Sequence, residues 1–132
     1  MTSTEAKHKD TGETMSEVIA QIPSELPHDA VGIWHIDPLG ETAFHLSGGH
    51  LTDFVRRAIY ALLDAGAVPV RYEPGSEYEW VHQKQYGLTR EEIAEAIVRE
   101  WEPVPNDSYS MIEHCPWFAR PDPDFPNYVK MD

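Results

Sequence analysis

The hydrophobic and polar positions between residues 48 and 66 predict an amphipathic helix. Apolar side chains recur there at steps of three and four residues, which places them on one helical face, while charged and hydroxyl side chains fall opposite. Gly66 follows the last apolar position and suits the left-handed residue that closes a helix, because it has no Cβ. The apolar face consists of Leu51, Phe54, Val55, Ala58, Ile59, Leu62 and Ala65. We expect the other elements to cover this face.

Alternating apolar positions before the helix predict a β-hairpin over residues 31–46. Its turn would be Asp37-Pro38-Leu39-Gly40, which has the residues that a type I turn favours. If Gly40 forms a bulge, His35 and His45 lie diagonally on one face of the hairpin. The opposite face then carries Trp34, Ile36, Phe44 and Leu46.

A second hairpin is predicted over residues 68–82. Its first strand contains Pro69, which has no N–H to donate and therefore belongs at a sheet edge or at the start of a strand. The sequence Glu73-Pro74-Gly75-Ser76 fits a type II turn, with Pro and Gly at the two central positions. The alternation from residue 77 to 82 predicts the returning strand.

Two capping boxes predict the starts of further helices. The first helix is short and ends before Pro23, whereas the second covers residues 90–101 and would be supported by a hydrophobic staple between Leu88 and Ile93. The capping pairs are Thr14 with Glu17, and Thr89 with Glu92.

These elements predict an α+β fold in the order ββαββα. The expected sheet is mainly antiparallel, has about four strands and carries both larger helices on one face. The alternative is an α/β fold with a parallel sheet. We expect residues 1–14 to be a flexible tail and residues 15–102 to form a single domain.

Residues 103–132 combine six prolines within 24 residues with several aromatic side chains. Disordered tails are poor in aromatic residues, so we expect an extended strap along the domain, with a short strand near Tyr109–Glu113. In the alternative, its aromatic side chains fill pockets on a partner or on a second copy of the chain.

The charge of the chain narrows the range of partners. The 132 residues include 23 acidic and 10 basic side chains, which gives a formal net charge of −13. Such a charge repels phosphate groups, so neither nucleic acid nor a membrane is expected as a partner. Cys115 is the single cysteine and has no other cysteine for an internal disulfide. No N-terminal apolar run resembles a signal peptide, and we expect a cytoplasmic protein.

Three histidines form the main candidate for a ligand or metal site. His35, His45 and His50 fall within sixteen residues. In the bulged hairpin, the Cβ atoms of His35 and His45 would lie about 7 Å apart, close enough to share an ion, with His50 completing the set. In the other register the first two point to opposite faces. The simpler interpretation is a group of histidines on a half-exposed sheet face.

The remaining candidates are weaker. Gly48 and Gly49 precede a helix and could present N–H groups to an anion, yet no nucleotide-binding pattern is present. Cys115 next to His114 suggests a thiol nucleophile, but adjacent residues of an extended segment point to opposite sides. We therefore expect a buried structural thiol and no cofactor, with a metal left open.

The sequence shows no family resemblance, and two functional hypotheses follow from the residues alone. The first is a protein-interaction module, such as an inhibitor, immunity-type or regulatory protein, that binds a basic protein surface through acidic and aromatic side chains. The second is a small enzyme or a ligand- or metal-binding domain that uses the three histidines. The balance is against an enzyme, and a homodimer is possible. The expected partner-binding residues are Glu77, Glu79, Glu91, Glu95 and Trp117.

Overall fold

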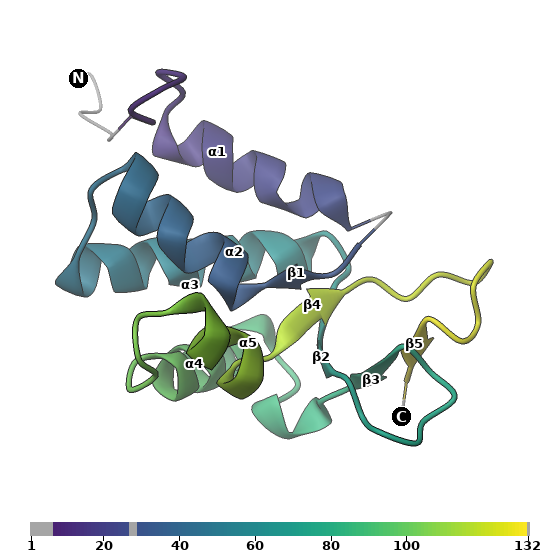
Figure 1. Cartoon of the computed structure of the whole chain (residues 1–132). Coiled ribbons are helices and arrows are strands. Elements are labelled where there is room, and N and C mark those ends of the chain that lie inside the picture. The colour runs from purple at the N-terminus through teal and green to yellow at the C-terminus, as the bar shows by residue number, and fades with distance from the viewer. Residues whose placement is uncertain (1–6, 27–28, 132) are drawn as a thin grey trace.

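The chain folds as an α+β protein in which helices and a mixed sheet share one main core. The computed structural model describes residues 7–26 and 29–131. Figure 1 shows most of the helices gathered on one side of the molecule, with β3 and β5 at the opposite side. The helical elements of this part of the chain are α1 (Met15–Gln21), η1 (Ile22–Glu25), α2 (Ile33–Pro38), η2 (Leu39–Ala43), α3 (Gly48–Asp64), η3 (Lys84–Tyr86), α4 (Arg90–Trp101) and α5 (Ser108–His114).

The five strands of the described residues form one mixed sheet in the order β1-β4-β2-β3-β5. Neighbouring strands are antiparallel except β3 and β5, which are parallel. The α+β class is therefore confirmed, but the sheet has one strand more than expected and the order ββαββα is not followed. The strands are β1 (Val31–Gly32), β2 (Val68–Arg71), β3 (Trp80–His82), β4 (Trp117–Ala119) and β5 (Val129–Lys130).

Helix α3 confirms the amphipathic helix predicted from the hydrophobic pattern. Its buried side chains are six of the seven predicted ones, and they pack in the main core with residues of α1, α2 and α4. Gly66 has a φ of +94°. The N–H groups of Gly66 and Ala67 donate to the carbonyls of Leu63 and Leu62 at 3.0 and 3.1 Å, which is the pattern of a Schellman motif.

The second hairpin is also confirmed, since Val70 lies opposite His82 in an antiparallel pair, but its returning strand is shorter than predicted and covers only Trp80–His82. In the turn, the N–H of Ser76 donates to the carbonyl of Glu73 at 3.1 Å. The φ of Gly75 is +87°, as the third position of a type II turn requires. Of the two placements expected for Pro69, the start of a strand is correct. Pro69 is the second residue of β2, and β2 lies inside the sheet between β4 and β3.

Both predicted capping boxes are present. The hydroxyls of Thr14 and Thr89 accept from backbone N–H groups three residues further on, and the glutamates at those positions bond back to the capping residues. Helix α4 covers the predicted residues 90–101. The hydrophobic staple is wrong, because Leu88 is 93% exposed and so buries almost none of its surface.

The hairpin predicted over residues 31–46 is wrong. Only Val31–Gly32 forms a strand, and residues 33–43 form α2 and the π-helix η2. Gly40 is a packing residue and not a turn residue, since an added Cβ would lie 2.7 Å from Leu51 Cδ1 and 2.9 Å from Phe54 Cδ2. The apolar residues of this segment also fit helical spacing, and the buried positions between residues 33 and 46 are Ile33, Ile36, Asp37, Gly40, Ala43 and Phe44.

The segment after residue 103 contributes a helix and two strands and is not wholly extended. Residues 108–114 form α5, so the short strand expected near Tyr109–Glu113 is wrong. Strand β4 lies between β1 and β2, where Phe118 pairs with Val31 on one side and with Pro69 on the other. The side chain of Phe118 is fully buried in the main core.

The predicted N-terminal tail lies partly outside the described residues, which begin at Lys7. Residues 7–14 form a short closed loop in which Lys7 and Thr14 make an isolated antiparallel bridge. The N–H of His8 donates to the carbonyl of Glu13 at 2.7 Å. The boundaries of the single domain, residues 15–102, stay a prediction.

Candidate functional site

Three acidic side chains of α4 bind arginines, and two of these arginines come from other elements. Arg56 Nε of α3 donates to Glu95 Oε1 at 2.5 Å, and Arg71 Nη2 of β2 donates to Glu100 Oε1 at 2.6 Å. Glu91, one of the predicted partner-binding residues, accepts from Arg90 at 3.3 Å. Each pair is partly exposed and contributes at most about 1 kcal/mol to stability, but together they reduce the negative charge that this helix offers to a partner.

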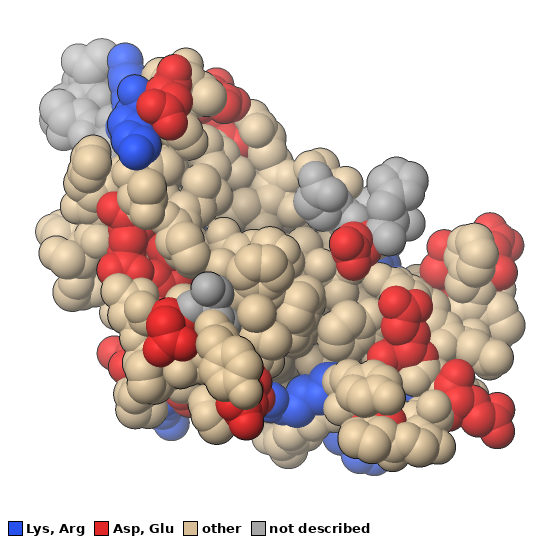
Figure 2. Space-filling view, viewed as in Figure 1, with Lys and Arg blue, Asp and Glu red and all other residues tan. Residues whose placement is uncertain are grey.

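The predicted residues Glu77 and Glu79 lie at a different end of the molecule. Both are exposed, and neither forms an ion pair with any other described residue. Glu73, Asp124 and the half-buried Asp122 likewise have no ion-pair partner among the described residues. In Figure 2, acidic side chains gather at the right-hand end of the molecule, over the 72–79 loop and the segment between β4 and β5.

Tryptophan side chains cover the sheet face that lies opposite the main core. Trp117 of β4 lies 5.3 Å from Trp80 of β3 and 6.0 Å from Trp34, measured between ring centroids. Trp80, Trp117 and Tyr128 are half-buried and pack on a second, smaller core that contains only residues of the strands and of the segments beside them. Trp117, one of the predicted partner-binding residues, therefore belongs to a row of aromatic side chains.

A pocket of about 480 Å³ lies beside Tyr128 at the acidic end of the molecule, and its lining also includes the cationic side chain of Arg120. Phe125, which is 65% exposed, and Tyr128 line it together with the carboxylates of Glu79 and Asp122. Burial and, secondarily, the negative charges of Glu79 and Asp29 raise the pKa of Tyr128 above its ordinary value. We call this region the acidic–aromatic surface and define it by Glu77, Glu79, Trp80, Trp117, Asp122, Asp124, Phe125 and Tyr128.

The structure does not bring the three candidate histidines together in the way the sequence suggested. His35 lies in the first turn of α2, with its ring 4.0 Å from that of Trp34. His45 is exposed in the loop before α3 with a φ of +55°, and His50 is exposed in the first turn of α3. The hairpin that would place His35 beside His45 does not form. Within residues 7–26 and 29–131, no group of three His, Cys, Asp or Glu side chains is arranged to hold a metal ion.

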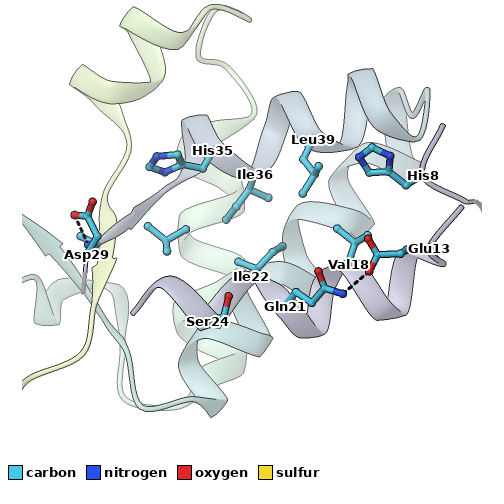
Figure 3. A pocket seen from close by; sticks show the side chains of 12 residues that line it. His8, Glu13, Val18, Gln21, Ile22, Ser24, Asp29, His35, Ile36 and Leu39 are labelled. Atoms are coloured by element: carbon cyan, nitrogen blue, oxygen red, sulfur yellow. Dashed lines mark hydrogen bonds between the residues drawn. The ribbon is translucent and has the colours of Figure 1, made fainter. Parts of the chain in front are cut away.

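His35 instead lines a cavity of about 540 Å³ between α1 and α2. Figure 3 shows His35 and Asp29 at one end of this cavity and His8 and Glu13 at the other. Nδ1 of His35 accepts from the N–H of Gly32 at 2.9 Å, and Nδ1 of His8 accepts from the N–H of Asp10 at 3.1 Å. Neutral rings therefore carry their proton on Nε2. The apolar wall between the two ends includes Val18, Ile22, Ile36 and Leu39.

A buried carboxyl group is the main feature that sequence reasoning missed. Asp37 is only 3% exposed, and its Oδ2 accepts from Trp101 Nε1 at 3.0 Å. Burial, with a smaller contribution from a hydrogen bond to Glu41, raises the pKa of Asp37 from its ordinary value of 3.8 to about 7. If residues 33–41 are read as a helix, Asp37 lies on the same face as Ile33 and Glu41, because it is four residues from each. This reading would have indicated that the carboxyl group is buried.

The environment of the single cysteine agrees with the expectation of a buried structural thiol. Cys115 is 1% exposed, and its N–H continues the helical bonding of α5 by donating to the carbonyl of Met111 at 3.0 Å. Burial, and next to it the charge of Glu100, raises the pKa of its thiol to about 11. Because the thiolate is the reactive form, this side chain is a poor nucleophile at neutral pH.

Comparison of the chain with models of protein families, with curated proteins and with solved structures gives no match. In the described part of the chain, none of the helices has both the length and the apolar character needed to cross a membrane.

Proposed function

We propose that this protein binds a lysine- or arginine-rich segment of another protein through the acidic–aromatic surface and acts as a non-enzymatic inhibitor or regulator. The observation that carries the proposal is the combination of exposed carboxylates and aromatic rings on one surface. Within the described residues, these carboxylates have no cationic side chain as an ion-pair partner.

Charge complementarity selects the class of partner. The net charge of −13 attracts cationic proteins at long range and speeds their association. At the surface itself, Glu77, Glu79 and Asp122 offer acceptors for lysine and arginine side chains. The carboxylates of α4 are less suited to this role, because Glu91 and Glu95 already bind Arg90 and Arg56.

The aromatic side chains supply the rest of the contact. The face of a tryptophan or tyrosine ring attracts a guanidinium or ammonium group, with about 0.5–2 kcal/mol for each contact. Trp80 and Trp117 are half-buried, so their rings are already fixed by packing and lose little conformational freedom on binding. Phe125 adds an exposed apolar side chain at the rim of the pocket.

A hexa-arginine peptide is a suitable probe for this surface. We expect it to bind with an affinity that falls as NaCl is raised from 50 to 300 mM, and to shift the indole N–H signals of Trp80 and Trp117 in nuclear magnetic resonance (NMR) spectra. The double variant Glu77→Gln/Glu79→Gln should weaken binding about three- to tenfold, on the basis of roughly 0.3–0.7 kcal/mol for each exposed carboxylate.

Two matched controls separate this surface from a general effect of charge. Glu91→Gln/Glu95→Gln changes the net charge equally and should weaken binding less than twofold. Phe125→Ala should weaken binding, whereas Tyr109→Ala, which removes another exposed ring, should not. Equal losses in the two double variants, or peptide-induced shifts centred on α4, would contradict the proposal.

A second candidate function rests on the cavity of Figure 3, which has an apolar wall and a histidine at each end. This arrangement fits a small elongated molecule with an apolar middle. The fluorescent probe 1-anilinonaphthalene-8-sulfonate tests it in the folded protein. Ser24→Trp, which fills the mouth of the cavity from an exposed position, should abolish the fluorescence gain, whereas the exposed control Lys84→Trp should keep it. Retained binding in Ser24→Trp would exclude this cavity.

A further inference from the structure

A third pocket lies on the other side of α2, where the π-helix η2 meets α3 and the end of α4. It has a volume of about 660 Å³. Asp37, Glu41 and Trp101 form its inner part, and the exposed residues Gly48 and Glu102 lie at its rim, where it opens to solvent. The walls also include the apolar side chains of Leu51 and Val104. The site is separate from the acidic–aromatic surface and from the cavity between α1 and α2.

The inner part of this pocket contains hydrogen-bond acceptors without matching hydrogen-bond donors. Asp37 Oδ2 accepts from Trp101 Nε1, but when Asp37 is ionised its buried Oδ1 has no hydrogen-bond donor among the described residues. Asn106 Nδ2 donates to Glu41 Oε1 at 2.8 Å, so the amide oxygen of Asn106 is a further acceptor. A buried carboxylate oxygen without a partner is destabilising, and a ligand that supplies hydrogen-bond donors would remove this destabilisation.

The charged groups around Asp37 favour a cation. Glu41 lies within hydrogen-bond reach of Asp37, so Asp37 can donate a hydrogen bond to Glu41 only while Asp37 keeps its own proton. Glu102 adds a carboxylate at the rim, and Cys115 lies nearby as a neutral thiol. Among the described residues that line the pocket, Arg56 is the one with a positive charge, and its Nε is engaged by Glu95.

We propose that the Asp37–Glu41 pocket binds a small primary ammonium ion with a short apolar chain. Its three N–H groups would reach Asp37, Glu41 and the amide oxygen of Asn106, while the chain lies against Leu51 and Val104. The ammonium group replaces the proton that the two carboxyl groups share. Binding therefore releases close to one proton below neutral pH, and affinity falls about tenfold for each pH unit below the pKa of Asp37.

Binding of n-butylammonium chloride to the full chain tests this proposal. The reporter is the indole N–H signal of Trp101, because this group donates to Asp37. We expect a saturable shift of this signal at pH 7.5 and binding roughly 20- to 30-fold weaker at pH 5.5. Calorimetry at pH 6 in two buffers of different ionisation enthalpy should show the release of about one proton.

Variants test whether the change in the Trp101 signal comes from binding in this pocket. Asp37→Asn removes the negative charge but keeps an acceptor for Trp101, and it should weaken n-butylammonium binding at least tenfold and abolish proton release. Glu102→Gln, at the rim, should change the affinity less than threefold. Tetramethylammonium has the same charge but no N–H group, so it should not shift the Trp101 signal. The proposal is overturned if Trp101 does not respond at 50 mM amine, if Asp37→Asn binds normally, or if tetramethylammonium binds equally well.

Discussion

Replacing Asp37 by asparagine should stabilise the protein at and above neutral pH and have little effect in acid. The pKa of the buried carboxyl is raised from 3.8 to about 7. Between these values the folded protein keeps a proton that the unfolded chain releases, so the wild-type protein loses stability as pH rises through this interval. Above pH 7 the carboxylate is ionised in both states and the whole cost is present. Asparagine does not titrate, so the variant does not lose stability as the pH rises through this interval.

The expected magnitude follows from the same two pKa values. One pH unit corresponds to about 1.4 kcal/mol, so the full interval from 3.8 to about 7 is equivalent to about 4 kcal/mol. Because the isoelectric point is near 4.8, the practical range is pH 5.5 to 8.5. Over this range the free energy of unfolding of Asp37→Asn, relative to wild type, should rise by about 2 kcal/mol and level off near pH 8.

Urea unfolding followed by tryptophan fluorescence measures this difference at each pH, and an unchanged dependence on urea confirms that both proteins unfold from the same compact state. Asp124→Asn is the matched control, since Asp124 is exposed and its replacement should give a difference that does not vary with pH. A difference between Asp37→Asn and wild type that stays constant from pH 5.5 to 8.5 would refute the reasoning.

Three other predictions concern packing, capping and thiol reactivity. Gly40→Ala should destabilise the protein by about 1–3 kcal/mol in urea unfolding, because its Cβ would lie 2.7 Å from Leu51. The control Gly49→Ala, with no atom within 4 Å of the added Cβ, should be neutral or slightly stabilising. Equal effects of the two substitutions would contradict the close approach of Gly40 to α3. Thr89→Ala should cost about 1 kcal/mol by removing the hydroxyl that accepts from the start of α4, and a change below the error of the same assay would show that the cap is dispensable. Cys115, which is 1% exposed, should react with an aromatic disulfide reagent only at the rate of protein opening, and immediate labelling of the native protein would contradict its burial.

The sequence predicted best those elements that are determined by neighbouring residues. The two capping boxes, the Gly66 helix end and the Pro74-Gly75 turn all formed as expected, because each depends on a few consecutive residues and on backbone conformations that these residue types favour. Helix α3 belongs to the same class, since seventeen residues with one apolar face leave little choice of structure.

The failures came from contacts between distant parts of the chain. Residues 31–46 fit the spacing of a strand and of a helix, and contact of Gly40 with α3 decides for the helix. Likewise, the pairing of Glu95 with Arg56 joins residues 39 positions apart, so the sequence showed an acidic helix but not its arginine partners. The hairpin places Asp37 in the turn Asp37-Pro38-Leu39-Gly40, whereas helical spacing from Ile33 places it on the buried face of α2.

The place of β4 in the sheet has a consequence for the order of folding. Strand β4 lies between β1 and β2, where Phe118 pairs with Val31 and Trp117 pairs with Val70. Strands β1 and β2 therefore cannot be joined through β4 until residue 119 has been synthesised. The contacts between α3 and α4, by contrast, need only residues 48–101. Contacts that close long loops form slowly, so the helical half of the core should assemble first. Completion of the sheet is then the late step that commits the chain to its folded state.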